Sequence, residues 1–175
     1  MKIAVIPARG GSKRIPRKNI REFCGKPIIA YSIAAAQQTG LFDQIVVSTD
    51  DEEIAAVARA FGATTPFIRP KEIADDFTGT NAVVKHAISW FGEQENDVAH
   101  ACCLYATAPL VQARFIKESF EALVRSDAAF AFSVTSYAFP IQRAVRIVPG
   151  GRVDAIYPEH RMTRSQELEH AYHDA

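Results

Sequence analysis

Short apolar runs alternate, along the first 134 residues, with longer segments whose apolar residues recur at helical spacing. A short continuous apolar run predicts a strand buried on both faces, and the longer periodic segments predict helices that each bury one face. Pro27 begins one helical segment, and Gly40 follows its end. The predicted strands cover 2–7, 44–48, 64–68, 99–105 and 128–134, and the predicted helices cover 27–38, 51–61, 80–91 and 112–125.

This alternation indicates an α/β fold with three layers, in which helices cover both faces of a mostly parallel sheet. Its crossover connections are expected to be right-handed. In such sheets ligands bind beyond the carboxyl ends of the strands. A basic loop after the first strand, Thr49 and Asp50, Arg69, and the segment 106–110 all fall at that edge. We therefore expect the functional site there.

The pattern changes after Val134. Segments 143–148 and 152–156 flank a Pro-Gly-Gly turn and predict a hairpin. The following residues, 157–175, are polar with few apolar anchors, so they form either a surface flap or an arm that packs on a second subunit. We expect one domain over 1–175, with a nucleotide-binding core at 1–134 and a hairpin and arm at 135–175.

Composition excludes several classes of protein. The chain has 175 residues, is 48% hydrophobic, and carries 20 basic and 20 acidic residues, so its net charge favours neither nucleic acid nor a membrane surface. Three cysteines, two of them adjacent at Cys102 and Cys103, suit neither a zinc site nor a disulfide framework. Reduced cysteines, with no visible signal peptide or membrane span, predict a cytoplasmic protein.

The first predicted strand leads into a loop with five basic residues, Arg9, Lys13, Arg14, Arg17 and Lys18, and with Gly10, Gly11 and Ser12 among them. Glycines let a backbone approach a ligand closely and adopt left-handed conformations, and loop N–H groups can converge on an anion. The spacing matches neither the P-loop nor the dinucleotide fingerprint. The loop therefore predicts a triphosphate site built from Lys and Arg; the alternative is a solvated basic turn, and Arg14 and Arg17 fit either description.

These residues resemble a known family. The motif ARGGSK at 8–13, followed by I-P-x-K-N at 15–19, is similar to the opening motif of the CMP-sialic acid synthetases, cytidylyltransferases that activate nine-carbon acidic sugars. Within that family, YPE at 157–159, RSQ at 164–166 and YHDA at 172–175 resemble the pseudaminic acid cytidylyltransferases. The resemblance covers essentially the whole chain and implies a Rossmann-like nucleotidyltransferase fold.

Nucleotidyl transfer from CTP places charge on the α-phosphate and on the leaving pyrophosphate, and cations aimed at those oxygens supply most of the stabilisation. Arg9 and Lys13 are therefore expected catalytic residues, and the resemblance adds Lys18, which matches the second half of the family motif. The resemblance places Arg69 against the cytosine and Thr80 near a hydroxyl position of the same pocket, and small Ala8 lets the base approach. The expected nucleotide-binding residues are Ala8, Arg9, Gly10, Gly11, Ser12, Lys13, Lys18, Asn19, Arg69 and Thr80.

The sugar acid needs donors for its carboxylate. The resemblance places 105–109 in a segment that lines the sugar pocket, where Tyr105 replaces the usual glutamine and Val111 replaces an arginine. These departures favour a substrate other than the common sialic acid. The histidines at 160, 170 and 173 are interpreted as surface residues. The expected sugar-binding residues are Tyr105, Thr107, Gln142, Arg143, Arg164 and Gln166.

The resemblance also implies Mg²⁺, held by two aspartates in an acidic motif near the C-terminus. The sequence ends at Ala175 before such a motif, so we expect a truncated chain that binds CTP and turns over slowly or not at all. Asp50 and Asp51 are an alternative metal site, although Asp51 equally explains a helix start. Asp76 either caps the third predicted helix or contacts the nucleotide.

The resulting hypothesis is a homodimeric cytidylyltransferase that joins CMP from CTP to a nonulosonic acid, pseudaminic acid in the first instance, and releases pyrophosphate. Its expected partners are CTP and an acidic nine-carbon sugar, without nucleic acid or membrane. Two rival substrates remain, a 3-deoxy-octulosonate and N-acetylneuraminate. A rival of another class is an inactive nucleotide-binding or dimerisation module.

Overall fold

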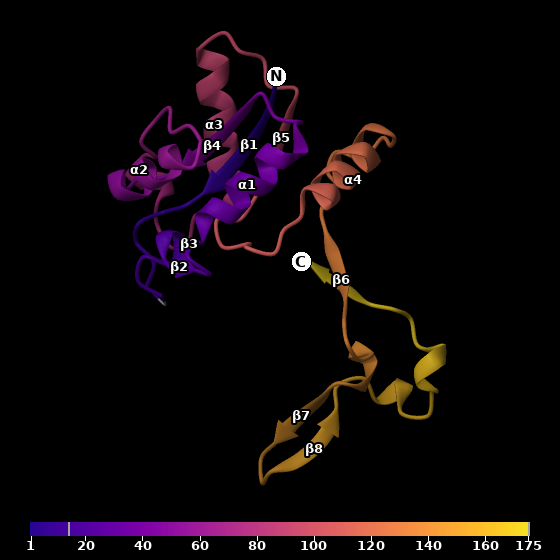
Figure 1. The fold of residues 1–175 in the computed structure, drawn as a ribbon. Coiled ribbons are helices and arrows are strands. Elements are labelled where there is room, and N and C mark those ends of the chain that lie inside the picture. Colours follow the sequence, from indigo (N-terminus) through magenta and orange to yellow (C-terminus); the bar gives the residue numbers. More distant parts are fainter. Residues whose placement is uncertain (14, 175) are drawn as a thin grey trace. The chain divides into compact units, whose positions relative to one another are not determined.

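The structure is a computed structural model that describes residues 1–13 and 15–174. The expectation for Arg14 lies outside the described residues. The chain divides into two compact units, Met1–Glu118 and Ser119–Ala175, and each is described by itself (Figure 1). The sequence analysis placed the end of the nucleotide-binding core at 134, and that boundary stays a prediction.

A parallel three-stranded sheet forms the centre of the first unit. Its strand order is β4 (Gln44–Ser48), β1 (Lys2–Pro7) and β5 (His100–Cys103), with β1 in the middle (Figure 1). Each residue from Ile3 to Ile6 is fully buried, which explains why β1 carries a continuous apolar run rather than an alternating one. The predicted bounds of β1 and β4 are confirmed.

Helices cover both faces of this sheet, so the predicted three layers are confirmed (Figure 1). Ile3 and Val5 of β1 pack with α3 (Thr80–Glu93), whereas Ala4 and Ile6 point to the opposite face. There they pack with α1 (Ile29–Thr39) and α2 (Glu52–Ala60). Alternate residues of one strand therefore serve two separate cores.

The helix ends follow local sequence signals. Gly40 ends α1 with φ at 63°, a left-handed conformation that glycine adopts at little cost. The side chain of Asp51 accepts a hydrogen bond from the Ile54 N–H at 3.0 Å and caps α2. The remaining helix is α4 (Ala113–Val124), and a small hairpin joins β2 (Glu22–Phe23) to β3 (Lys26–Pro27).

The second unit holds two antiparallel pairs. In the first pair, β6 (Val134–Ser136) lies against β9 (Tyr172–Asp174). In the second, β7 (Val145–Val148) and β8 (Arg152–Ala155) form the predicted hairpin, whose turn has positive φ at both glycines. The hairpin prediction is confirmed.

Two predicted strands are wrong. Residues 128–133 form no strand, and β6 begins only at Val134; the Phe130 and Phe132 side chains in this run are 82% and 73% exposed. Segment 64–68 contributes a single bridge, between Thr64 and Val46. A strand forms only where the backbone finds a ladder partner, and an apolar pattern does not specify that partner. Within the described part of the chain, no helix is both long enough and apolar enough to span a bilayer.

Candidate functional site

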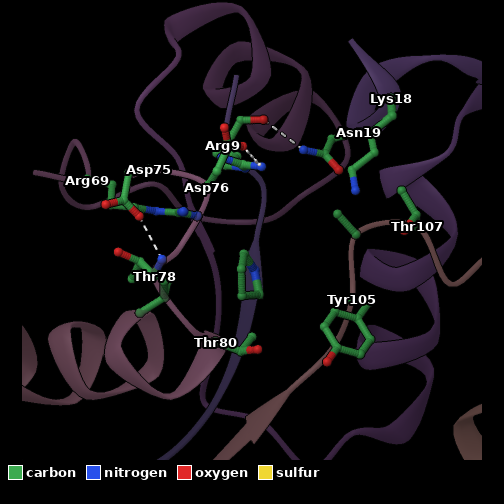
Figure 2. A pocket seen from close by; sticks show the side chains of 13 residues that line it. Arg9, Lys18, Asn19, Arg69, Asp75, Asp76, Thr78, Thr80, Tyr105 and Thr107 are labelled. Carbon is green, nitrogen blue, oxygen red and sulfur yellow. Dashed lines mark hydrogen bonds and ion pairs between the residues drawn. The ribbon is translucent and has the colours of Figure 1, made fainter. Parts of the chain in front are cut away.

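A pocket lies in the first unit, beyond the carboxyl ends of β1 and β5, as the parallel sheet predicts (Figure 2). Loops far apart in sequence build it. In Figure 2, Lys18 and Asn19 lie across the pocket from Arg69, and Tyr105 lies below them. The lining residues are Pro7, Arg9, Lys18, Asn19, Arg69, Asp75, Asp76, Thr78, Thr80, Val83, Tyr105, Ala106 and Thr107.

Two basic residues of the loop share one carboxylate at this pocket. Nη2 of Arg9 lies 2.5 Å from Oδ1 of Asp76 (Figure 2), and the Lys13 ammonium forms an ion pair with Oδ2. The Lys13 hydrogen bond, and next the Arg9 hydrogen bond, lower the pKa of Asp76. The helix-cap interpretation of Asp76 is wrong, because the N-cap of α3 is Gly79. Asp76 instead faces the cations that were predicted to bind phosphate.

The basic loop is held by contacts within itself and with the residues at the start of α2. The Gly10 N–H donates to Oδ1 of Asp50 at 2.9 Å, and Nδ2 of buried Asn19 donates to the Arg9 carbonyl oxygen at 2.9 Å. Arg17 is not simply solvated, because its guanidinium forms ion pairs with both Asp51 and Glu53. The Arg17 hydrogen bond is the largest cause of the lowered pKa of Asp51.

Gly10 is required by close packing rather than by a left-handed backbone. A Cβ at this position would lie 2.7 Å from Oδ2 of Asp51, whereas a Cβ on Gly11 would meet nothing within 4 Å. Neither glycine has positive φ, and Arg17 is left-handed, with φ at 54°, among residues 8–13 and 15–19 of this loop. The expectation of left-handed glycines is therefore wrong.

Arg69 is a buried cation at the pocket wall. Its side chain donates from Nε to Oγ of Ser48 at 3.1 Å and from Nη2 to the Ser48 carbonyl oxygen, and the residue is 4% exposed. Burial lowers the pKa of Arg69. Among residues 1–13 and 15–174, no carboxylate forms an ion pair with it. A buried guanidinium without a paired charge is costly, which is typical of a functional position.

Sequence reasoning missed Asp75 and Thr78. Oδ1 of Asp75 accepts hydrogen bonds from the N–H groups of Phe77 and Thr78, at 2.9 and 2.6 Å, and both Asp75 and Thr78 line the pocket. Hydrogen bonds from Thr78 lower the pKa of Asp75. The signal that could have found them is the Asp-Asp-Phe-Thr-Gly run before α3, a turn-forming sequence at the expected sheet edge.

Seven of the predicted site residues line this one pocket: Arg9, Lys18, Asn19, Arg69, Thr80, Tyr105 and Thr107. Five others, Ala8, Gly10, Gly11, Ser12 and Lys13, belong to the same loop without lining the pocket. The remaining four, Gln142, Arg143, Arg164 and Gln166, lie in the second unit. Within that unit, Gln142 donates to the Glu169 carbonyl oxygen, and Arg143 donates to the carbonyl oxygens of Arg161 and Thr163.

Comparison with known proteins shows the family of this chain. The model of the cytidylyltransferase family matches residues 3–169, and the chain belongs to this family. The enzyme is therefore a nucleotidyltransferase that uses CTP.

Relatives and solved structures extend the comparison. The chain is 47% identical, over 99% of its length and 75% of the relative's, to a pseudaminic acid cytidylyltransferase of Campylobacter jejuni subsp. jejuni serotype O:23/36. It is 39% identical, over 68% of its length and 51% of the relative's, to a CMP-N,N'-diacetyllegionaminic acid synthase of Legionella pneumophila. The structure of CMP:2-keto-3-deoxy-manno-octonic acid synthetase complexed with CTP matches 99% of this chain and 71% of its own, at a TM-score of 0.65 and 24% identity, and supports the fold.

Proposed function

We propose that this enzyme transfers CMP from CTP to the anomeric hydroxyl of pseudaminic acid and releases pyrophosphate. One observation carries the proposal: Arg9 and Lys18 of the basic loop and Arg69 of a separate segment line a single pocket at the ligand-binding edge of the sheet. The Campylobacter relative, which is named for this activity, supports the choice of sugar.

In this reaction a bond forms between the anomeric oxygen and the α-phosphorus, and the bond from that phosphorus to the bridging β-phosphate oxygen breaks. The anomeric hydroxyl loses its proton, and the electron pair of the broken bond leaves with pyrophosphate. Arg9, Lys13 and Lys18 would neutralise the charge that develops on these oxygens. The Gly10, Gly11 and Ser12 backbone would complete the cradle. Asn19 would hold the loop in shape through its hydrogen bond to the Arg9 carbonyl oxygen.

Arg69 is the proposed cytosine contact. Its hydrogen bonds to Ser48 engage Nε and Nη2, while its guanidinium also lines the pocket. A guanidinium has five N–H donors, so donors remain for a base. A buried donor that finds no acceptor on a ligand is penalised, which would favour a base with a carbonyl at that position. Thr80 would supply a hydroxyl to the same subsite, and Ala8, which is fully buried, would leave room for the base.

Tyr105 and Thr107 would face the sugar, because they line the pocket immediately after β5. Gln142, Arg143, Arg164 and Gln166 remain proposed sugar contacts supplied by the arm. We propose a homodimer in which the second unit makes the contact between subunits. Its many exposed apolar side chains, among them Phe139 at 81% and Ile147 at 81%, support this proposal.

The proposed metal is Mg²⁺, which would enter with CTP and supply positive charge to offset that of the phosphates. Among the described residues, no group of three or more His, Cys, Asp or Glu side chains is arranged to hold a metal ion. The nearby carboxylates are already engaged, Asp76 by two cations and Asp50 by the Gly10 N–H. These residues therefore do not form a magnesium site by themselves, and we assign no step of the reaction to the metal.

Pyrophosphate release tests the proposal. The enzyme with CTP and magnesium should release pyrophosphate with pseudaminic acid at a higher kcat/KM than with N-acetylneuraminate or a 3-deoxy-octulosonate. Preference for another sugar would correct the substrate alone. Binding of CTP without release on any of the three sugars would instead support an inactive nucleotide-binding module.

A further inference from the structure

Asp76 makes an unexpected contact for a residue in a nucleotide pocket. Its two carboxylate oxygens are shared between Arg9 and Lys13, one oxygen to each cation. These are the same cations that the proposed function assigns to the CTP phosphates. The pair with Arg9 is largely shielded, with side chains 29% and 26% exposed, whereas Lys13 is 82% exposed at the rim.

A carboxylate that binds two cations resembles a phosphate group in its chemistry. Both present anionic oxygens to Arg and Lys through charge-assisted hydrogen bonds. Arg9 and Lys13 cannot form well-aligned hydrogen bonds with Asp76 and with a phosphate at the same time. A phosphate placed beside the free carboxylate would also meet like-charge repulsion.

We propose that Asp76 is an internal substitute for phosphate, which holds Arg9 and Lys13 in place until a CTP phosphate displaces it. The inference rests on the proposed function and adds a positioning residue to it. Asp76 keeps the two cations at the pocket before the nucleotide arrives. It also makes binding an exchange of one anion for another.

The surroundings of Asp76 suit such an exchange. The residue lies in the irregular segment between a 3-10 turn at Lys71–Ile73 and the start of α3 at Thr80. The neighbouring Phe77 side chain is 94% exposed, so little packing opposes a movement of this segment. Asp75, by contrast, is tied into the turn by the N–H groups of Phe77 and Thr78. The two adjacent aspartates therefore have different tasks.

The exchange has a consequence for product release. After transfer, pyrophosphate lies between the same cations, and Asp76 competes with it for them. Return of the carboxylate to Arg9 and Lys13 would weaken pyrophosphate binding. Asp76 should thus lower the affinity for every phosphate-bearing ligand while leaving the affinity for the bare nucleoside unchanged.

The experiment compares the binding of CTP, pyrophosphate and cytidine to wild type and Asp76→Asn by calorimetry, in buffer without divalent cations so that only protein groups contact phosphate. We expect Asp76→Asn to bind CTP and pyrophosphate about 3- to 10-fold more tightly, since two partly exposed ion pairs no longer compete. Cytidine should bind both proteins equally. Asp76→Ala, which removes the same charge with a smaller side chain, should give the same direction.

Glu72→Gln is the matched control. It also removes one negative charge from this part of the chain, but Glu72 is exposed in the 3-10 turn at Lys71–Ile73, does not line the pocket and leaves the contacts of Asp76 intact. Its affinity for CTP should stay within about 2-fold of wild type, because Glu72 forms no ion pair with either cation in the described structure.

Weaker binding of CTP by both Asp76 variants would overturn the inference and make Asp76 a supporting group for the bound state. Equal tightening of cytidine would also overturn it, because the effect would then not act through phosphate. If wild type binds no CTP, even with magnesium added, the proposed function fails and this inference fails with it. Wild-type binding that weakens in Asp76→Asn affects this inference alone.

Discussion

Nδ2 of Asn19 donates a hydrogen bond to the main-chain carbonyl oxygen of Arg9 at a distance of 2.9 Å, and so joins the two ends of the basic loop. Asn19 is only 4% exposed, while Lys13, near the middle of the loop, is 82% exposed. The loop is therefore fixed at its base and open at its tip. This arrangement lets the cations at the tip adjust to a ligand while the backbone of the cradle keeps its shape.

Replacing Asn19 should damage the pocket through this backbone bond. Asn19→Ala leaves the Arg9 carbonyl oxygen without its side-chain donor, which costs about 1–2 kcal/mol of folding free energy. The KM for CTP should rise about tenfold, because the loop loses the backbone geometry that positions its cations while it keeps the cations themselves. Urea unfolding and steady-state kinetics measure the two effects. Unchanged CTP kinetics would show that the loop does not depend on this bond.

Gly10 and Gly11 form a natural pair of test and control. Gly10→Ala places a methyl group 2.7 Å from Oδ2 of Asp51, so either the loop or the Asp51–Arg17 ion pair must shift. We expect CTP affinity to fall about tenfold in Gly10→Ala, which corresponds to about 1.4 kcal/mol of lost binding free energy, because the phosphate-binding loop is displaced. Gly11→Ala meets nothing within 4 Å and should bind CTP like wild type. Similar losses in both variants would refute the packing explanation.

Replacing Arg69 should weaken the use of CTP strongly while changing the folding stability little. Arg69→Met removes a buried cation that has no ion-pair partner among the described residues, so the lost desolvation penalty offsets the lost hydrogen bonds. The Ser48 carbonyl oxygen still accepts a hydrogen bond from the Ala8 N–H at 2.9 Å. The free energy of unfolding should change by less than about 1 kcal/mol, while kcat/KM for CTP falls at least about 100-fold. A large loss of stability in urea would make Arg69 a structural residue instead.

The lowered pKa of Asp51 predicts that the folding stability depends on pH. The Arg17 hydrogen bond lowers the folded-state pKa of Asp51, so the stabilisation is present above the unfolded pKa of about 3.9 and is lost as the pH falls through the folded value. Asp51→Asn keeps a side-chain oxygen to cap α2 but loses the ion pair. At pH 7 it should be less stable than wild type by under about 1 kcal/mol, since both partners are partly exposed.

The measurement for Asp51 is urea unfolding of wild type and Asp51→Asn at several pH values. The difference in stability should shrink steadily below about pH 4, where the wild-type carboxylate becomes protonated. Arg17→Gln removes the other partner and should show the same convergence. A difference that stays constant down to pH 2 would mean that the ion pair is not its source.

The sequence predicted most of the first unit because burial on both faces leaves an unambiguous signal. The runs at β1 and β4 are continuous and apolar, and their bounds match the structure. The run at 128–133 carries the same signal without the strand, because pairing depends on a partner that local sequence does not encode. Apolar content alone therefore specifies neither a ladder nor burial, since Phe130 and Phe132 in this run are 82% and 73% exposed.

The pocket was predictable to a similar degree. The strand ends and the basic loop pointed to Arg9, Lys18 and Arg69, which line one pocket. Asp76 was predicted either to cap the third helix or to contact the nucleotide, but its contact with Arg9 and Lys13 depends on how two loops fold toward each other, and spacing in the sequence does not reveal that distance.

The pairing of β6 with β9 also shapes how this enzyme can diversify. Val134 lies opposite Asp174, and Ser136 lies opposite Tyr172, so the chain leaves and returns at neighbouring points. Everything between them, including the β7–β8 hairpin, is an excursion whose two ends are held together. This excursion can lengthen, shorten or change sequence without altering the spacing of β6 and β9, which anchor its two ends. Substrate range could then evolve in the excursion while the phosphate cradle, built from residues before 110, stays unchanged.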